Sequence, residues 1–395
     1  MADRFAKQGR LTFAEYMELA LYWPGGGYYA RPRTAGHDYF TAPAAHPAFG
    51  ALLALQLEEM WETLGRPADF VVLEPGAGWG HLARDVAGYA GHLSPRFASA
   101  LRYVAIDRVA AMPANLPSTV QWLRAAGVPL RHVTGVVLSN ELFDALPVHR
   151  VVVRNGSLRE VYVINDQGRL ADAEGEPSSP ALAQRLAEEG IALAEGQQAE
   201  VCLALAPWLR EASDALERGF LLTIDYGHTA AELYGPQRLK GTLRCYFQHT
   251  VSASPYDYPG GQDITAHVDF TALERMGARH GLESYPLVRQ GAFLRNLGLG
   301  DLQRRLTVAD LRQGRRDANR MAMLEIARSG SMGDFRVLVQ RKNAPASRLT
   351  GLEGPLPAWK ERLARLPLPL LDDAHLEVMA ARYPHLAGSY EDLWG

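Results

Sequence analysis

The stretch that decides the fold is FVVLEPGAGWG, residues 70–80, in which a short apolar run meets a cluster of glycines. A β-branched, apolar run closed by glycines is typical of a buried parallel strand. Glycines at such a turn tolerate positive φ angles, and they let the main chain approach a ligand without an intervening Cβ. The stretch therefore predicts a strand, a tight ligand-binding turn and the start of a helix.

The same strand pattern recurs three times downstream, in the apolar runs 103–106, 135–138 and 220–224. Each run ends in polar residues, namely Asp107, Ser139-Asn140-Glu141 and Asp225-Tyr226. Apolar strands that alternate with helical segments predict an α/β fold with a parallel sheet and helices on both faces. In such folds ligands bind at the carboxyl ends of the strands.

Other segments complete the predicted domain. Residues 49–64 carry apolar side chains every three or four positions, as expected for an amphipathic helix. Asn155-Gly156 predicts a hairpin within 148–164, because this dipeptide favours a two-residue turn. Helices are predicted at 179–194, 199–217 and 270–280, and an antiparallel closing pair is predicted between 285–288 and 335–339.

The chain is expected to have three parts. Residues 1–48 form an N-terminal cap, with the loop-like WPGGGYY at 23–29, rather than a regular layer. Residues 49–342 form the main α/β domain, with insertions at about 146–200 and 228–267. Residues 343–395 form a C-terminal extension, in which WKERLARL at 359–366 is compatible with a short amphipathic helix that the sheet does not need.

Composition narrows the class of protein. The 395 residues are 47% hydrophobic and 22% charged, as in ordinary globular proteins, and the net charge of -3 disfavours nucleic acid as the main partner. Two cysteines, Cys202 and Cys245, rule out a disulfide framework and paired zinc knuckles. The start of the chain lacks the apolar stretch of a signal peptide, and no apolar run reaches the roughly 18 residues of a membrane span. We expect a soluble, cytoplasmic protein.

The glycine turn also indicates what kind of ligand binds. Its G-x-G-x-G spacing differs from the G-x-G-x-x-G of dinucleotide-binding turns. Glu74 suits a ligand with an ammonium group, because a carboxylate repels a diphosphate. Asp107 is placed to accept hydrogen bonds from ribose hydroxyls. The alternative is that Gly76, Gly78 and Gly80 form only a tight turn and that Asp107 caps a helix.

Several strings beyond the glycine turn carry a resemblance to a known family. They are LTFAEYMELALYWPGGGYYA (11–30), DYFTAP (38–43), EPGAGWG (74–80), SNELFDALPVHR (139–150), IDYG (224–227), GTLRCYFQH (241–249), DITAHVDF (263–270) and QGAFLRNLG (290–298). In this order they resemble the MidA-like methyltransferases, which include the mitochondrial protein-arginine methyltransferase that assists assembly of respiratory complex I. The resemblance covers most of residues 11–340.

The resemblance implies a class I methyltransferase fold, which is a Rossmann-like, seven-stranded sheet with an N-terminal cap and inserted antiparallel or lid segments. It implies S-adenosylmethionine as the cofactor and a protein substrate, a subunit of NADH dehydrogenase; a homodimer is compatible with it. The implied cofactor residues are Glu74, Gly76, Ala77, Gly78, Gly80, Asp107 and Asn140. Asp107 departs from the family, which more often has Glu at this position.

Catalytic candidates follow the third strand. An arginine guanidinium is charged near neutral pH, so an enzyme that methylates it should supply carboxylates. Glu141 is the first candidate, with Asn140 and Asp144 beside it; the alternative is that the two acids only complement a helix dipole. Tyr226 either faces the same pocket or belongs to a structural turn.

The segment 234–267 is a second candidate wall of the site, because long irregular segments in compact domains are usually functional. Its candidate polar residues, with Asp269 just after it, are Arg244, Tyr246, His249, Asp263 and His267. His267 is a candidate base or substrate contact, and the irregular spacing predicts no metal site. Tyr28 and Tyr29 line the pocket or simply pack.

Three other functions stay open at this point. One is a non-catalytic assembly factor that retains the methyltransferase fold. Another is a methyltransferase acting on a small molecule. The third is a nicotinamide dehydrogenase, which Glu74 and the glycine spacing disfavour.

Overall fold

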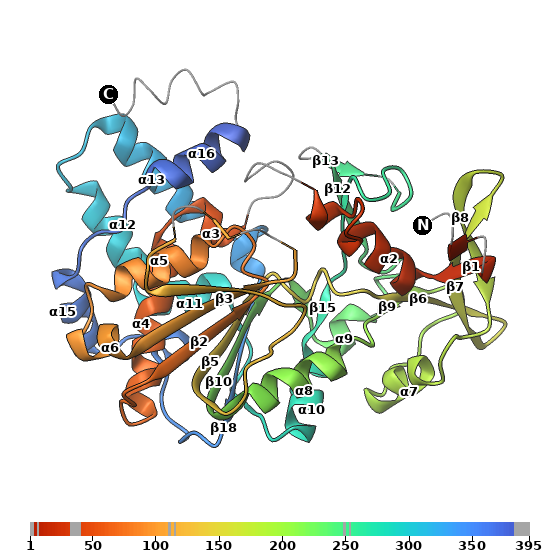
Figure 1. Cartoon of the computed structure of the whole chain (residues 1–395), viewed down its shortest axis with the longest axis horizontal. Coiled ribbons are helices and arrows are strands. Elements are labelled where there is room, and N and C mark those ends of the chain that lie inside the picture. Colours follow the sequence, from red (N-terminus) through yellow and green to blue (C-terminus); the bar gives the residue numbers. More distant parts are fainter. Residues whose placement is uncertain are drawn as a thin grey trace. The chain divides into compact units, whose positions relative to one another are not determined.

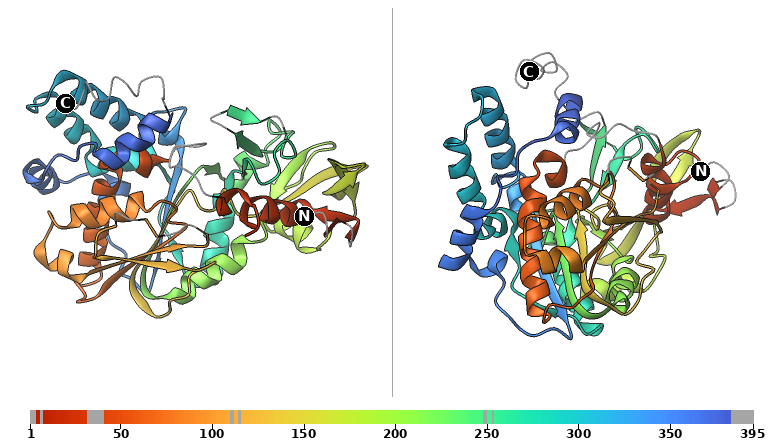
Figure 2. Two further views of the ribbon diagram at one scale, coloured as in Figure 1. Left: turned by 45° about the horizontal axis from the view of Figure 1, so that its top comes forward. Right: turned by 60° about the vertical axis from the view of Figure 1, so that its left-hand side comes forward.

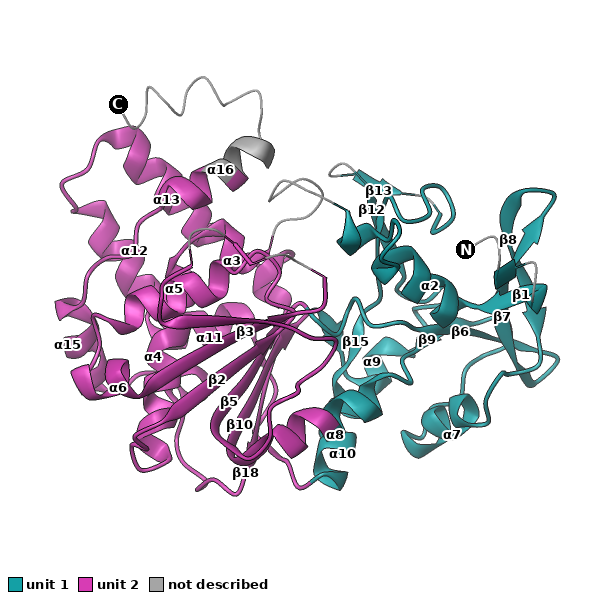
Figure 3. Ribbon diagram, in the orientation of Figure 1, with its two compact units in different colours: residues 1–32, 142–210, 226–280 teal, residues 33–141, 211–225, 281–395 magenta. Residues whose placement is uncertain are grey.

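A computed structural model describes residues 4–5, 8–31, 41–109, 112–113, 116–247, 250–252 and 254–382 of the chain (Figure 1). The chain divides into two compact units (Figure 3). Unit 1 comprises residues 1–32, 142–210 and 226–280, and unit 2 comprises residues 33–141, 211–225 and 281–395. Each unit is built from segments that are distant in sequence.

Unit 2 contains the large sheet. Its strands among the described residues are β2 (Phe70–Pro75), β3 (Leu101–Asp107), β4 (Val120–Arg124), β5 (Val133–Asn140), β10 (Leu216–Asp225), β16 (Glu283–Ser284), β17 (Val288–Arg289) and β18 (Arg336–Lys342). They lie in the order β16-β18-β10-β5-β2-β3-β4, and β17 also pairs with β18. The short β16 and β17 both pair with the same neighbour, so the sheet has seven strand positions, as the class I fold requires.

The direction of the strands fixes where a ligand binds. The five strands from β10 to β4 pair in parallel, whereas β18 runs antiparallel to β10. After β2 the chain adds β3 and β4 on one side, and it then returns to place β5 on the other side. The strand order therefore reverses between β2 and β5, and ligands bind at the carboxyl ends of the strands at such a point.

Helices pack on the sheet of unit 2 (Figure 2). One face contacts residues of α4 (Ala48–Thr63), α5 (His81–Ala90), α6 (Pro95–Ala100), α11 (Gln290–Leu297), α12 (Leu299–Thr307) and α13 (Gln313–Glu325) in one continuous core. On the opposite face Leu73, Val137 and Leu221 are buried as well. Burial on both faces explains why the strands read as continuous apolar runs rather than alternating ones.

After β18 the described chain, which ends at Arg382, stays within unit 2. It forms α14 (Thr350–Glu353), α15 (Pro357–Arg365) and α16 (Asp373–Arg382), and the predicted helix at 359–366 is confirmed by α15. Thr350 and Gly351 bind Glu59 and Gln56 of α4. The segment is thus part of the packed structure of this unit.

Unit 1 is mainly antiparallel. One sheet has the order β1-β7-β6-β9, with β8 beside β7, and a second has the order β13-β12-β14. The bounds are β1 (Arg10–Thr12), β6 (His149–Arg154), β7 (Ser157–Asp166), β8 (Arg169–Gly175), β9 (Gln198–Val201), β12 (Arg244–Phe247), β13 (Thr250–Ser252), β14 (Asp263–Thr265), and the short parallel pair β11 (Gly227–His228) with β15 (Val268–Asp269). Its helices are α2 (Phe13–Tyr22), α7 (Ala181–Glu188), α9 (Ala230–Leu233) and α10 (Phe270–Arg279); α8 (Leu205–Ala215) crosses between the units.

The predicted hairpin is confirmed, because β6 and β7 pair around Asn155 and Gly156, which have φ angles of 52° and 71°. None of the described helices is both long enough and apolar enough to cross a membrane.

Three local predictions were wrong. The region 199–217 is not one helix, because residues 198–201 form β9 by pairing with β6. The helix predicted at 179–194 ends at Glu188, and Gly190 follows with a φ of 69°. The N-terminal segment holds the regular helix α2, whose start is marked by a capping box of Thr12 and Glu15 that the sequence analysis overlooked.

Candidate active site

The glycine turn lies at the end of β2, at the point where the strand order reverses. Gly76, Gly78 and Gly80 have φ angles of 74°, 55° and 71°, and Gly80 is the N-cap of α5. Residues other than glycine adopt such φ angles only at a cost in free energy. The three glycines of the sequence therefore suit this backbone path. Gly76 is exposed and Gly78 half-exposed, whereas Ala77 between them is buried. The turn thus presents main chain to a ligand.

Asp107 ties the end of β3 to this turn. Its Oδ2 accepts a hydrogen bond from the Gly78 N–H at 3.0 Å, and its Oδ1 accepts one from the Val109 N–H at 2.8 Å. Among the residues described after β3, Asp107 does not start a helix, so the capping alternative is wrong.

Glu74 is buried beneath the turn. Its Oε2 accepts a hydrogen bond from the hydroxyl of Tyr103 on β3 at 2.8 Å. Burial is the main cause that raises the pKa of Glu74 to about 8; the Tyr103 hydrogen bond opposes the rise, and the nearby Asp107 adds to it. A cation near Glu74 would favour its ionised form.

These residues fit S-adenosylmethionine. A Cβ on Gly78 would meet nothing closer than the Gly76 oxygen at 4.0 Å, so the turn leaves open space where a ligand can contact backbone. Two carboxyl groups, Glu74 and Asp107, lie beside that space and are matched to a ligand that carries an ammonium group and ribose hydroxyls.

Asn140 and Glu141 end the neighbouring strand β5. Glu141 has a φ of 49°, which is uncommon for a residue other than glycine, asparagine or aspartate. Its N–H donates to the Ile224 carbonyl at 2.9 Å, and Asn140 Nδ2 donates to its Oε1 at 3.2 Å. β5 is followed directly by turns and bends at 141–148 and then by β6, not by a helix. The interpretation of Glu141 and Asp144 as acids at a helix N-terminus is therefore wrong.

Asp144 lies within unit 1 and is buried. The Tyr226 hydroxyl donates to its Oδ2 at 2.5 Å, and burial raises the pKa of Asp144 to about 6 against the effect of this hydrogen bond. Among the described residues Asp144 has no ion-pair partner. Tyr226 thus orients the Asp144 carboxyl, which has no cationic partner among the described residues.

His267 belongs to the same part of unit 1. Its ring packs edge-on against Tyr226, with centroids 5.4 Å apart, and it stacks on His228. Its pKa is lowered to about 4, first by burial and then by His228, Arg238 and Arg244. His267 Nδ1 is buried without a hydrogen-bond partner in the described residues, so it is a neutral ring with an unused nitrogen.

The N-terminal tyrosines reach the predicted wall within unit 1. Tyr29 donates to Asp263 Oδ1 at 3.0 Å, and its ring stacks on Tyr22. Asp263 pairs with Tyr246 across β14 and β12. Burial raises the pKa of Tyr246, Arg244 opposes this, and the charges of Asp263 and Asp144 add to the rise.

Not every residue predicted in the wall belongs to this group. Asp269 caps α10 through the Ala272 N–H and also pairs with Arg185, so it has a structural role. Tyr28 is buried in the core of unit 1. His249 lies outside the described residues.

The sheet order and the glycine turn together define the Rossmann-like fold of a class I methyltransferase. Residues 52–288 match the family described as "Putative S-adenosyl-L-methionine-dependent methyltransferase", and the chain belongs to this family.

Relatives support this assignment. The chain is 29% identical over 324 residues to the Drosophila melanogaster "Protein arginine methyltransferase NDUFAF7 homolog, mitochondrial", covering 73% of this chain and 72% of that protein. It is 27% identical to the Homo sapiens NDUFAF7 over 332 residues, with coverages of 74% and 70%. A crystal structure from Burkholderia thailandensis, bound to S-adenosyl-homocysteine, superposes with a TM-score of 0.78 at 29% identity and covers 90% of this chain and 94% of that one.

Sequence reasoning missed the partners of the site residues. Tyr103 was read only as part of a strand, although it binds Glu74, and Arg238 was not considered, although it binds His228 at 2.8 Å. No local pattern could have linked these pairs. Tyr226 and Asp144 were each singled out, but the hydrogen bond between them was not foreseen.

Proposed function

We propose that this methyltransferase transfers a methyl group to an arginine side chain of a protein. The observation that carries the proposal is Asp144, a buried carboxyl oriented by Tyr226 and without a cation among the described residues. Burying a charge without a partner is costly, so the group favours a cationic substrate that completes the pair. A guanidinium is such a group, and carboxylates bind it through two parallel hydrogen bonds.

The chemistry requires one proton to leave the acceptor. Bound S-adenosylmethionine supplies an electrophilic methyl group; the new carbon–nitrogen bond forms as the carbon–sulfur bond breaks. The nitrogen that gains the methyl group loses a proton. Asp144, with a pKa raised to about 6, is the candidate acceptor of that proton, and His267, whose lowered pKa disfavours protonation, is a candidate substrate contact.

The aromatic rings of unit 1 suit the same substrate. Tyr29 and Tyr226 donate hydrogen bonds to Asp263 and Asp144, Tyr246 pairs with Asp263 across the strands, and Tyr22 stacks on Tyr29. Aromatic faces attract cations, and arginine most often. Within unit 2, Glu141 is a further candidate functional carboxylate, because strained backbone positions such as the one after β5 gather at functional sites.

For the client we propose a subunit of NADH dehydrogenase. The support is the family resemblance and the relatives, which are named protein arginine methyltransferases. A cytoplasmic location remains part of this proposal.

The test is methyl transfer from isotopically labelled S-adenosylmethionine to recombinant NADH dehydrogenase subunits, with mass spectrometry to locate the label. We expect label on arginine. Asp144→Asn should lower kcat/KM by about 100-fold or more, as removal of a proton acceptor does, and leave the affinity for S-adenosyl-homocysteine unchanged. The matched control is Asp166→Asn, which changes an exposed carboxylate of the same unit and should have no effect.

Other outcomes decide between the alternatives. Label on free small molecules but on no protein would replace the proposal with a small-molecule methyltransferase. Binding of S-adenosyl-homocysteine without transfer to any tested subunit, together with capture of one of them, would favour a non-catalytic assembly factor.

A further inference from the structure

The C-terminal part of the chain runs along helix α5 of unit 2, which begins at the cofactor turn. We call residues 366–376 the strap. The Tyr89 hydroxyl, near the end of α5, donates to the Pro367 carbonyl at 3.0 Å. Further along, the strap reaches Arg84 and Asp85 through His375. The strap therefore lies antiparallel to α5, from its last turn to its first.

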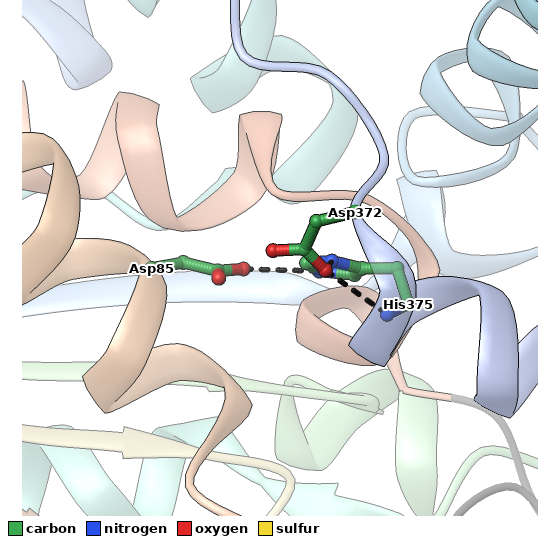
Figure 4. A group of neighbouring side chains, drawn as sticks. All are labelled: Asp85, Asp372 and His375. Atoms are coloured by element: carbon green, nitrogen blue, oxygen red, sulfur yellow. Dashed lines mark hydrogen bonds and ion pairs between the residues drawn. The ribbon is translucent and has the colours of Figure 1, made fainter. Parts of the chain in front are cut away.

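His375 is fully buried and is held between two carboxylates (Figure 4). Its Nδ1 lies 2.7 Å from Asp372 Oδ1, and its Nε2 lies 3.1 Å from Asp85 Oδ2. Carboxylates at both ring nitrogens favour the doubly protonated ring, whereas Arg84, whose Nη2 lies 3.1 Å from Nδ1, opposes it. Arg84 Nη2 binds Asp85 Oδ1 at 2.9 Å, so two positive and two negative charges balance in the cluster.

Asp85, Asp372 and His375 are also of the types that hold a metal ion. The guanidinium of Arg84 argues against this, because Nη2 lies 3.1 Å from His375 Nδ1 and 3.6 Å from Asp372 Oδ1. A metal ion would have to sit against this cation and to displace both ring protons. We read the cluster as an ion-pair latch.

The latch contacts the part of α5 that supports the cofactor turn. The Arg84 N–H donates to the carbonyl of Gly80, the last glycine of the turn, at 2.9 Å. The ring of His81, the first residue of α5, lies 6.0 Å from the ring of His375. A shift of Arg84 or Asp85 would therefore move the first turn of the helix and with it the glycine turn.

We propose that the strap fixes the cofactor turn by latching α5, and that His375 is a positioning residue for S-adenosylmethionine. The glycines of the turn have little preference for one conformation, so neighbouring structure must select it. Release of the strap should weaken cofactor binding without changing the chemical step at saturating cofactor.

The latch should depend on pH. The groups that face His375 are His81, Arg84 and Asp85 of α5, His46 before α4, and Asp372 of the strap. Burial lowers the pKa of His375, but the hydrogen bonds to Asp372 and Asp85 outweigh burial and the repulsion from Arg84, and the net effect raises it. A raised histidine pKa stabilises the latched state at low pH, and this stabilisation is lost as pH rises through the raised value.

The test uses the full chain and the variants Asp372→Asn, His375→Gln and Asp373→Asn. The His375 N–H donates to Asp372 Oδ1 at the start of α16, and an asparagine oxygen can accept the same hydrogen bond. Asp372→Asn therefore keeps the helix cap and removes the charge. Asp373→Asn is the matched control, because this neighbouring carboxylate is exposed. The readouts are hydrogen exchange of residues 366–376 between pH 6 and 9, the dissociation constant of S-adenosyl-homocysteine at pH 7, and KM and kcat for S-adenosylmethionine.

We expect exchange of the strap to rise with pH in the wild type and to be fast at every pH in Asp372→Asn and His375→Gln. The dissociation constant and KM should rise roughly five-fold or more in both variants, the lower end of coupling between linked sites, with kcat unchanged. The control should match the wild type. Slow exchange in both variants would show that the cluster is no latch, and fast exchange with unchanged affinity would show that the strap does not act on the turn.

Discussion

Glu141 combines a strained backbone with a candidate catalytic carboxylate. A φ of 49° costs a glutamate about 1 to 3 kcal/mol, whereas glycine adopts it freely. We predict that Glu141→Gly keeps or raises the Tm while it lowers kcat/KM by about 100-fold, the usual contribution of a positioned acid or base. Thermal unfolding and initial rates check this.

Glu141→Gln is the control for that prediction, because it keeps the strain and the size of the side chain. It should show the same loss of activity with no rise in Tm. Full activity in Glu141→Gln would remove the carboxylate from the mechanism.

Glu74 makes stability depend on pH. Its pKa is raised from the ordinary value of 4.5 to about 8 in the folded protein, chiefly by burial. The folded state therefore holds a proton that the unfolded state has lost, and the resulting stability is present below pH 4.5 and disappears as pH rises through 8. We predict that the Tm of Glu74→Gln falls less than that of the wild type between pH 5 and 8. Parallel Tm curves for the two proteins would contradict the buried, protonated state of Glu74.

At the scale of elements, the glycine turn can be compared with the hairpin turn at 155–156. Gly78 and Gly156 have φ angles of 55° and 71°, and an added Cβ meets no crowding at either position. Alanine at either position should therefore cost about 1 kcal/mol of stability through backbone strain alone. Only Gly78→Ala places a Cβ in the cofactor space, so only this variant should weaken binding of S-adenosyl-homocysteine.

Calorimetric titration measures the affinity of both alanine variants for S-adenosyl-homocysteine, and thermal unfolding measures their stability. Equal affinities in Gly78→Ala and Gly156→Ala would mean that the turn does not contact the ligand. A loss of affinity in both would indicate a general effect of destabilisation.

For the whole molecule, binding of the right cofactor should stabilise the folded chain. A ligand at 100 times its dissociation constant adds about 2.7 kcal/mol if it binds only the folded state. We predict a rise in Tm of several degrees with S-adenosyl-homocysteine and none with NAD, because the G-x-G-x-G turn and Glu74 disfavour a diphosphate. A shift with NAD alone would restore the dehydrogenase hypothesis.

The sequence by itself determined the sheet, the glycine turn and the carboxylate Asp107, because continuous apolar runs, glycine clusters and strand-end acids are local patterns. It missed β4, whose run 120–124 is half-exposed and carries no closing signal, and it read β9 as part of a helix. Only the tertiary structure decided the pairs Glu74–Tyr103, Asp144–Tyr226 and Asp85–His375. These partners are 29, 82 and 290 residues apart, and contacts over such separations depend on chain packing that leaves no periodic trace in the sequence.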